Sequence, residues 1–221
     1  MGCVVVWAFY LLLCAGCASR EVNVALTYAP VGRGLLSDLK SAVVSLRVVD
    51  QRPQEQRKGM GVQPPTISGA EPAVVISQSP AVQVVHNAIR TELERSGHRV
   101  LAPGQGHAEL TIRVGLTQFL LDSKVTDSHI ELLGSIQADV IAFASAGKTP
   151  GIYLFVVESA YPDLVPLGLF RPVLSGGAVG MLSSTTSKSH VKETMDRTLE
   201  VFMRRFCLAP ELRRVFTQVA E

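Results

Sequence analysis

The sequence predicts an α/β (α+β) fold, a two-layer sandwich in which two long helices cover one face of a four-stranded mixed sheet. Segments with alternating apolar and polar residues, typical of half-buried strands, recur after residue 41, and two further segments carry apolar residues at helical spacing. The segments follow the order β-α-β-β-β-α, in which the first crossover implies parallel strands and the later strands suit an antiparallel meander. A chain of 221 residues, 47% hydrophobic and 18% charged, has a globular composition.

Four strands are expected. The alternation is clearest after residue 108, where Leu110, Ile112 and Val114 are separated by polar residues. Such a pattern buries one face of a strand and leaves the other in water. The expected strands span residues 42–49, 109–117, 130–143 and 152–159.

Two long helices are expected. The first covers 80–96, with Ser79 as its N-cap, Pro80 at its first position and Gly97 as the left-handed residue that ends it. The second begins near Ser189 and is interrupted by a proline before a short last helix. Its apolar stripe consists of Val191, Met195, Leu199, Phe202 and Phe206.

Two long segments between these elements show no period. Residues 54–69 are polar and contain glycine and proline, which predicts a loop. Residues 160–186 are apolar and also rich in glycine and proline. We expect this second segment either to pack over the core or to form an exposed contact surface.

The first seventeen residues resemble an export signal. An uncharged apolar run, Val4 to Leu13, is followed by the small residues Ala15 and Gly16 and then by Cys17. A cysteine directly after the expected signal-peptide cleavage site resembles the lipobox of bacterial lipoproteins, in which the cysteine thiol receives a lipid. The alternative is a transmembrane anchor, which needs about 20 apolar residues.

This motif predicts a domain division. Residues 1–16 form a lipoprotein signal peptide, 17–41 the lipidated N-terminus and a tether, and 42–221 a single α/β domain. Of the cysteines Cys3, Cys14, Cys17 and Cys207, two leave with the signal and Cys17 is acylated. Cys207 then has no partner for an intramolecular disulfide, and we expect a buried, inert thiol.

Motifs for catalysis, metals and cofactors give little support to any of these activities. Residues 142–149 approach a phosphate-binding loop but lack its first glycine and precede a strand instead of a helix. No Gly-x-Ser-x-Gly occurs, and the five histidines lack metal-ligand spacing. We therefore expect no catalytic residues, no metal and no cofactor. A net charge of +2 also argues against nucleic acid as a partner.

Several polar residues are candidates for contact with a partner. The corner Asp50-Gln51-Arg52 has two interpretations. It is either a set of polar residues that simply ends a strand, or a structural corner that fixes the following loop or binds a partner. Glu109 and Arg113 belong to the polar face of the predicted sheet, together with Gln137 and Asp139. The candidate partner contacts are Asp50, Gln51, Arg52, Glu109 and Arg113.

The lipobox at Cys17, the corner Asp50-Gln51-Arg52 and the helix that closes on Ser96-Gly97 resemble the YajG-type family of bacterial lipoproteins. The resemblance covers residues 43–207 in element order, and segment 160–186 departs from it. It implies an envelope lipoprotein of uncharacterised function with no catalytic residues to carry over. Ala18 after the lipidated cysteine is similar to lipoproteins sorted to the outer membrane.

Two functions are compatible with these observations. The first is a non-enzymatic binding or assembly module, held in the lipid bilayer by acylated Cys17, facing the periplasm and contacting an envelope protein. The second is an envelope hydrolase or transferase with a site in loops 50–69 and 160–186, using Asp50, Arg52 or His190. A cleft that joins those loops would favour the enzyme, whereas a flat or apolar surface would favour the binding module.

Overall fold

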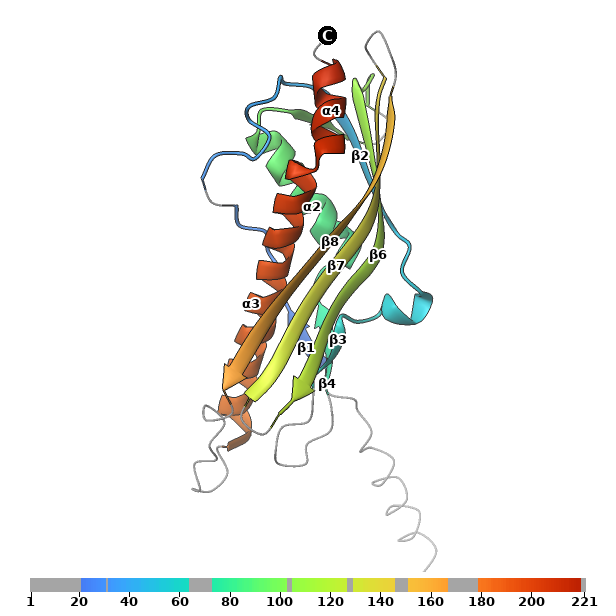
Figure 1. Ribbon diagram of the computed structural model, residues 1–221. Coiled ribbons are helices and arrows are strands. Elements are labelled where there is room, and N and C mark those ends of the chain that lie inside the picture. Colours follow the sequence, from blue (N-terminus) through green and yellow to red (C-terminus); the bar gives the residue numbers. More distant parts are fainter. Residues whose placement is uncertain are drawn as a thin grey trace, which may run out of the picture.

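The structure is a computed structural model (Figure 1). It describes residues 21–30, 32–63, 73–102, 105–126, 129–145, 151–166 and 179–219.

The main sheet has five strands in the order β5-β2-β6-β7-β8. Strand β2 runs parallel to both neighbours, and β6, β7 and β8 form an antiparallel meander, as the sequence predicted. The predicted count of four strands is wrong because a short edge strand, β5, follows the first helix. The strands are β2 (Val43–Asp50), β5 (Arg99–Leu101), β6 (Leu110–Val125), β7 (His129–Ala144) and β8 (Ile152–Pro166).

The helices α2 (Ala81–Arg95), α3 (Val179–Leu208) and α4 (Pro210–Val219) lie on one face of this sheet (Figure 1). Helix α2 packs on β2 and β5, and α3 and α4 pack on β7 and β8. All five residues of the predicted apolar stripe of α3 are buried. The two-layer arrangement is therefore confirmed, and the other face of the sheet carries no α-helix among the described residues.

A second, smaller sheet lies beside the lower half of β6, below the point where β2 ends. It has the order β1-β4-β3, with β1 (Glu21–Val24), β3 (Gly61–Gln63) and β4 (Ala73–Ser77). The Leu121 N–H in β6 donates to the Met60 carbonyl and so joins the two sheets. A single 3-10 turn, η1 (Gln54–Gln56), lies between β2 and β3.

Two sequence expectations need correction here. Residues 54–69 were expected to form a loop, but β3 lies within them. Residues 17–41 were expected to be a tether, but they contain β1 and the fully buried Leu36. Such short strands lack a detectable period because partners distant in sequence stabilise them. The folded domain therefore begins at or before Glu21.

A buried carboxylate fastens the N-terminal segment to α2. Glu92 is 1% exposed and accepts hydrogen bonds from the Tyr28 hydroxyl at 2.9 Å and from the Leu35 N–H at 2.5 Å. Arg95 pairs with the same carboxylate at 3.3 Å. Burial, and then the hydrogen bond to Glu92, raise the pKa of Tyr28, so its hydroxyl stays protonated as the donor.

The ends of three elements differ from expectation. Pro80 is itself the N-cap of α2, with its carbonyl accepting from Gln83 and Val84, so Ser79 lies outside the helix. Strand β8 continues past Ser159 to Pro166, because an edge strand tolerates proline where its missing N–H would point outward. Helix α3 begins ten residues earlier than expected, at Val179 instead of Ser189. Gly97 adopts a φ of +90° after α2, as predicted.

No helix in the described ranges combines the length and hydropathy that crossing a membrane requires. The signal segment and Cys17 lie outside the described residues, and so does 167–178 of the expected loop 160–186. The lipid anchor therefore stays a prediction.

Candidate binding surface

The Asp50-Gln51-Arg52 corner is held together internally. Arg52 is 3% exposed and makes a two-pronged ion pair with Asp50, at 2.9 and 2.8 Å from its Nε and Nη2. Its Nη1 donates to the carbonyls of Gln56 at 3.1 Å and Phe119 at 3.5 Å. The guanidinium also lies 6.0 Å from the centre of the Phe119 ring. Arg52 therefore ties the end of β2 to the η1 turn and to β6.

The electrostatics of this corner agree with a structural role. Hydrogen bonding from Arg52 holds the pKa of Asp50 below its usual value, with Arg57 adding a weaker attraction. Both charges are compensated within the fold, and Arg52 is almost inaccessible. Of the two interpretations left open by the sequence, the structure favours a device that fixes the following segment.

Of the other three candidate contacts, one is used within the fold and two are accessible at the surface. Glu109 accepts a hydrogen bond from the Val43 N–H at 2.7 Å and so secures the start of β2. Gln51 lies over Gly115, where an added Cβ would collide with its side-chain amide. Arg113 is exposed and lies 5.8 Å from the centre of the Phe143 ring. Gln51 and Arg113 thus remain on the accessible surface, on the sheet face opposite the helices.

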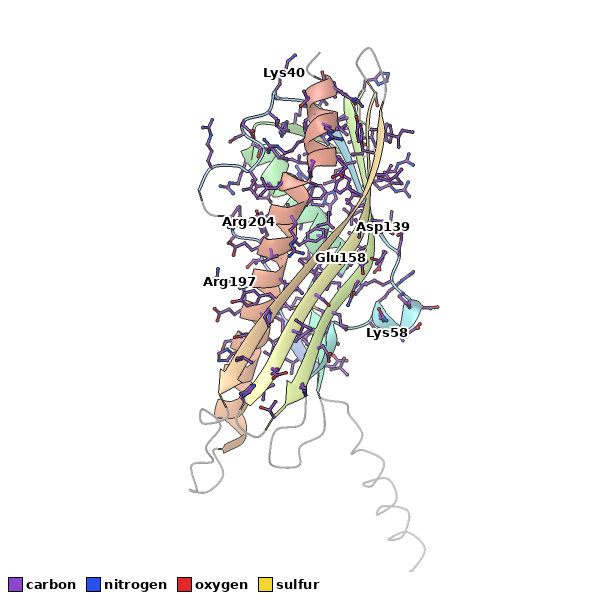
Figure 2. The ribbon with its side chains drawn as sticks, viewed as in Figure 1. Lys40, Lys58, Asp139, Glu158, Arg197 and Arg204 are labelled. Atoms are coloured by element: carbon purple, nitrogen blue, oxygen red, sulfur yellow. The ribbon has the colours of Figure 1, made fainter. Side chains whose placement is uncertain are left out.

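This helix-free surface, which we call the open face, follows from the strand register. Even-numbered residues of β2, of β7 and of β6 up to its irregularity at Leu116 point to the helices, so Arg47, Arg113 and Ile141 lie together on the open face. Arg47 in β2 is directly opposite Arg113 in β6, and Arg113 is directly opposite Ile141 in β7. Figure 2 shows Asp139 on this side of the sheet, away from α3.

Strand β8 extends the open face with an apolar row at the edge of the sheet. Ile152 is 69% exposed, Leu154 71% and Val156 56%, and the three alternate with residues that face the helices. An edge strand usually carries charges or bulges that prevent pairing with other chains. The opposite edge, β5, is only three residues long and begins with the exposed Arg99. The apolar start of β8, before the exposed Glu158 and Pro162, is therefore the unusual feature of this sheet.

The apolar row was missed at the sequence level. Residues 152–157 read Ile-Tyr-Leu-Phe-Val-Val, a continuous apolar run typical of a strand that is buried on both faces. The meander places this strand last, at an edge, so one of its apolar faces is in water. The run was visible in the sequence, but its position at the edge was not.

The residues suggested for an enzyme are not brought together. His190 lies 3.6 Å from Asp163 in β8, and Asp163 is opposite Leu132 in β7. Asp50 in β2 is opposite Leu116 in β6, which is in turn opposite Ala138 in β7. Six residues along β7 separate these positions by about 20 Å. The pocket beside the corner is lined by Arg52, residues 57–60 and residues 76–81, and includes no described residue of 160–186. Within the described residues, no group of three metal-ligating side chains occurs.

Cys207 is fully buried, as predicted, and burial raises the pKa of its thiol. A raised pKa keeps the sulfur protonated and unreactive.

No protein-family model matches this sequence, and no curated protein does. Similar solved structures include a Xanthomonas campestris protein of the DUF330 family, at 13% identity and a TM-score of 0.38, covering 83% of this chain and 96% of the other. The protein CT253 from Chlamydia trachomatis has 10% identity and a TM-score of 0.42, with coverages of 81% and 98%. Lipoprotein GNA1162 from Neisseria meningitidis has 8% identity and a TM-score of 0.31, with coverages of 69% and 99%. Likeness at this level establishes neither family nor function, and the YajG-type resemblance stays a prediction.

Proposed function

We propose that this chain is a lipid-anchored lipoprotein of the bacterial cell envelope that acts as a non-enzymatic binding or assembly module facing the periplasm. The observation that carries the proposal is the exposed apolar row Ile152, Leu154 and Val156 on the open face. Contiguous apolar surface in water is unfavourable and commonly marks a site of protein association. The exposed apolar row on this face supports binding over catalysis.

The predicted anchor suits this role. Cys17 precedes Glu21, the first residue of β1, by four positions, which span at most about 14 Å even when extended. The folded domain would therefore stand directly on the membrane surface. Ala18, which follows the predicted lipidation site, supports the outer membrane as its location.

The arrangement of the strands places the apolar row far from this anchor. Figure 1 shows β1 at the end of the molecule where β8 finishes, opposite the end where the C-terminus lies. Leu154 lies near the start of β8, twelve residues before Pro166, which corresponds to about 40 Å of strand. The row would thus be presented to partners in the periplasm and not to the membrane that holds the anchor.

Crosslinking in intact cells followed by mass spectrometry tests the proposal. We expect the wild-type protein to be recovered with an envelope protein attached. The double variant Leu154→Glu/Val156→Glu should lose that product because it puts charges into the apolar contact.

The matched control is Leu208→Glu, which changes an exposed leucine, 51% accessible, at the end of α3 in the helix layer. It should crosslink like the wild type. Recovery of the wild-type protein alone, or equal crosslinking of the double variant, would refute the proposed role of the open face.

A further inference from the structure

We infer that the open face binds a protein segment whose apolar side chains are flanked by carboxylates, and that Arg47 and Arg113 bind those carboxylates. The inference rests on the proposed function, which requires a protein partner, and it specifies the chemistry of that partner.

The two arginines form a like-charged pair with no counter-ion in the part of the chain that the structure describes. They are directly opposite each other in neighbouring parallel strands, which lie about 4.8 Å apart, and both side chains are exposed. Like charges opposite each other destabilise a sheet. Among the described residues, no carboxylate oxygen lies within 4.0 Å of either guanidinium. An acidic group from another molecule would remove this repulsion.

The nearest carboxylates of the open face do not serve this purpose. Glu109 directly precedes β6, four residues before Arg113, and its carboxylate already accepts a hydrogen bond from the Val43 N–H. Asp139 is opposite Gly115, in the row next to Arg113, and forms no ion pair among the described residues. Arg113 instead lies over the Phe143 ring, which holds its guanidinium at the border of the apolar part of the face.

Charge and apolar surface form one continuous patch. A single row crosses four strands, from Arg47 in β2 through Arg113 in β6 and Ile141 in β7 to Leu154 in β8. Three strand spacings make this row about 14 Å long. One bound segment can therefore contact the cationic half on β2 and β6 and the apolar half on β7 and β8 at once.

The position of the patch favours a protein over a lipid surface. An anionic headgroup would also satisfy two arginines, but the patch lies about 40 Å along β8 from the end of the molecule that carries the predicted anchor. In the sequence, residues 146–150 between β7 and β8 include no acidic residue. We therefore assign the carboxylates to another molecule.

The test uses the mature, lipidated protein in detergent and two labelled synthetic peptides. The peptides share the same leucines, which in one are flanked by glutamates and in the other by lysines. Fluorescence anisotropy should show the glutamate peptide binding at least about tenfold more tightly at low salt. The preference should fall in about 1 M salt, where the Debye length is only about 3 Å.

The variant Arg47→Gln/Arg113→Gln should lose most of this preference. Its melting temperature should equal or exceed that of the wild type, because the substitution removes two like charges at directly opposite positions of the sheet. The control Arg197→Gln/Arg204→Gln changes the same number of charges on α3, where Figure 2 shows both side chains pointing away from the sheet. This control should keep the full preference.

Each contrary result overturns the inference. Equal binding of the two peptides, binding of neither, or an unchanged preference in the Arg47→Gln/Arg113→Gln variant would exclude the carboxylate partner. Tighter Arg-dependent binding to phosphatidylglycerol vesicles than to the glutamate peptide would assign the arginines to lipid. The crosslinking experiment with Leu154→Glu/Val156→Glu tests the proposed function separately from the peptide experiment. Failure of this inference can therefore be distinguished from failure of the proposed function.

Discussion

Arg52 shows how one buried side chain organises the segment that follows β2. It binds Asp50 with two nitrogens and donates to the carbonyls of Gln56 and Phe119, so three separate parts of the chain meet at one guanidinium. A buried arginine of this kind stabilises the fold only while all its partners are in place. Its removal would leave the Asp50 carboxylate without its guanidinium partner, with the backbone N–H of residue 52 still donating to it, and would leave the two carbonyls without this donor.

We predict that Arg52→Ala lowers the free energy of unfolding by about 3 kcal/mol, the cost of breaking a largely buried ion pair. Urea denaturation of the purified protein measures the change. Arg57→Ala, which alters a side chain that is 48% exposed, should cost less than about 1 kcal/mol. Similar losses for the two variants would contradict the structural role assigned to Arg52.

His98 is a second buried polar residue, and its protonation state matters to the fold. Its Nδ1 accepts a hydrogen bond from the Ala42 N–H at 3.3 Å, and its ring packs on Phe216 with centroids 4.5 Å apart. Burial lowers the pKa of His98 from its ordinary value of 6.5, although a backbone hydrogen bond partly offsets the effect. The folded protein therefore holds the neutral ring, with Nδ1 free of a proton.

This shift predicts a pH dependence of stability. The unfolded chain binds a proton at His98 more readily than the folded chain, so stability is complete above pH 6.5 and is lost as the pH falls from 6.5 through the lower folded pKa. His98→Asn keeps an acceptor for Ala42 but does not titrate there. Thermal unfolding followed by circular dichroism should show a steeper loss between pH 7 and 5 in the wild type than in this variant. Parallel curves would contradict the assignment.

At the scale of elements, long periodic segments could be predicted from the sequence and short ones could not. Apolar residues alternate with polar ones in β2, β6 and β7, and they recur at helical spacing in the stripe of α3. The buried faces of these elements were therefore predicted correctly. Strands β1, β3 and β5 are three or four residues long and are specified by their partners, not by a local pattern. The start of α3 was missed because the apolar stripe begins only at Val191.

The candidate surface was predictable in part for the same reason. The polar, outward position of Arg113 followed from the alternation in β6, and the structure confirms it. Its position opposite Arg47 could not be predicted, because the register of two parallel strands depends on the packing of the helix between them. Asp50, Arg52 and Glu109 were proposed as partner contacts, but their charges are already used within the fold.

Gly61 marks the junction between the two sheets. It has a φ of +154°, and an added Cβ would overlap the carbonyl oxygen of Leu121 in β6. We predict that Gly61→Ala lowers the free energy of unfolding by about 3 kcal/mol, because backbone strain and a clash with main-chain atoms combine.

Urea denaturation checks this value against Gly59→Ala. An added Cβ at Gly59 would meet its nearest atoms at 3.3 Å, so we expect a loss below about 1 kcal/mol there. An unchanged stability of Gly61→Ala would mean that β3 does not join the main sheet as described.

At the scale of the whole molecule, the fold separates the anchored end from the apolar row. The small sheet and the buried Glu92 fix the N-terminal segment to the body of the domain, so the predicted lipid at Cys17 would be attached to a rigid base. Strand β8 then carries its exposed row toward the opposite end (Figure 1).

This arrangement depends on the lipid anchor, which gives a direct prediction. Cys17→Ala should abolish labelling by radioactive palmitate and leave an uncleaved precursor, because the modified thiol precedes signal removal. Labelling in cells followed by gel electrophoresis measures both effects. Cys207→Ala, at a buried thiol, is the control and should label normally. Normal labelling of Cys17→Ala would refute the anchor.

The most direct measurement of the central claim places a photo-crosslinking amino acid at single positions in the anchored protein in living cells. Positions Thr111 and Leu154 sample the open face, and Arg197 and Arg204 sample the outer side of α3. We predict crosslinks to the same envelope protein from Thr111 and Leu154 and none from the two positions on α3. Crosslinks confined to α3, or none from the open face, would contradict the account.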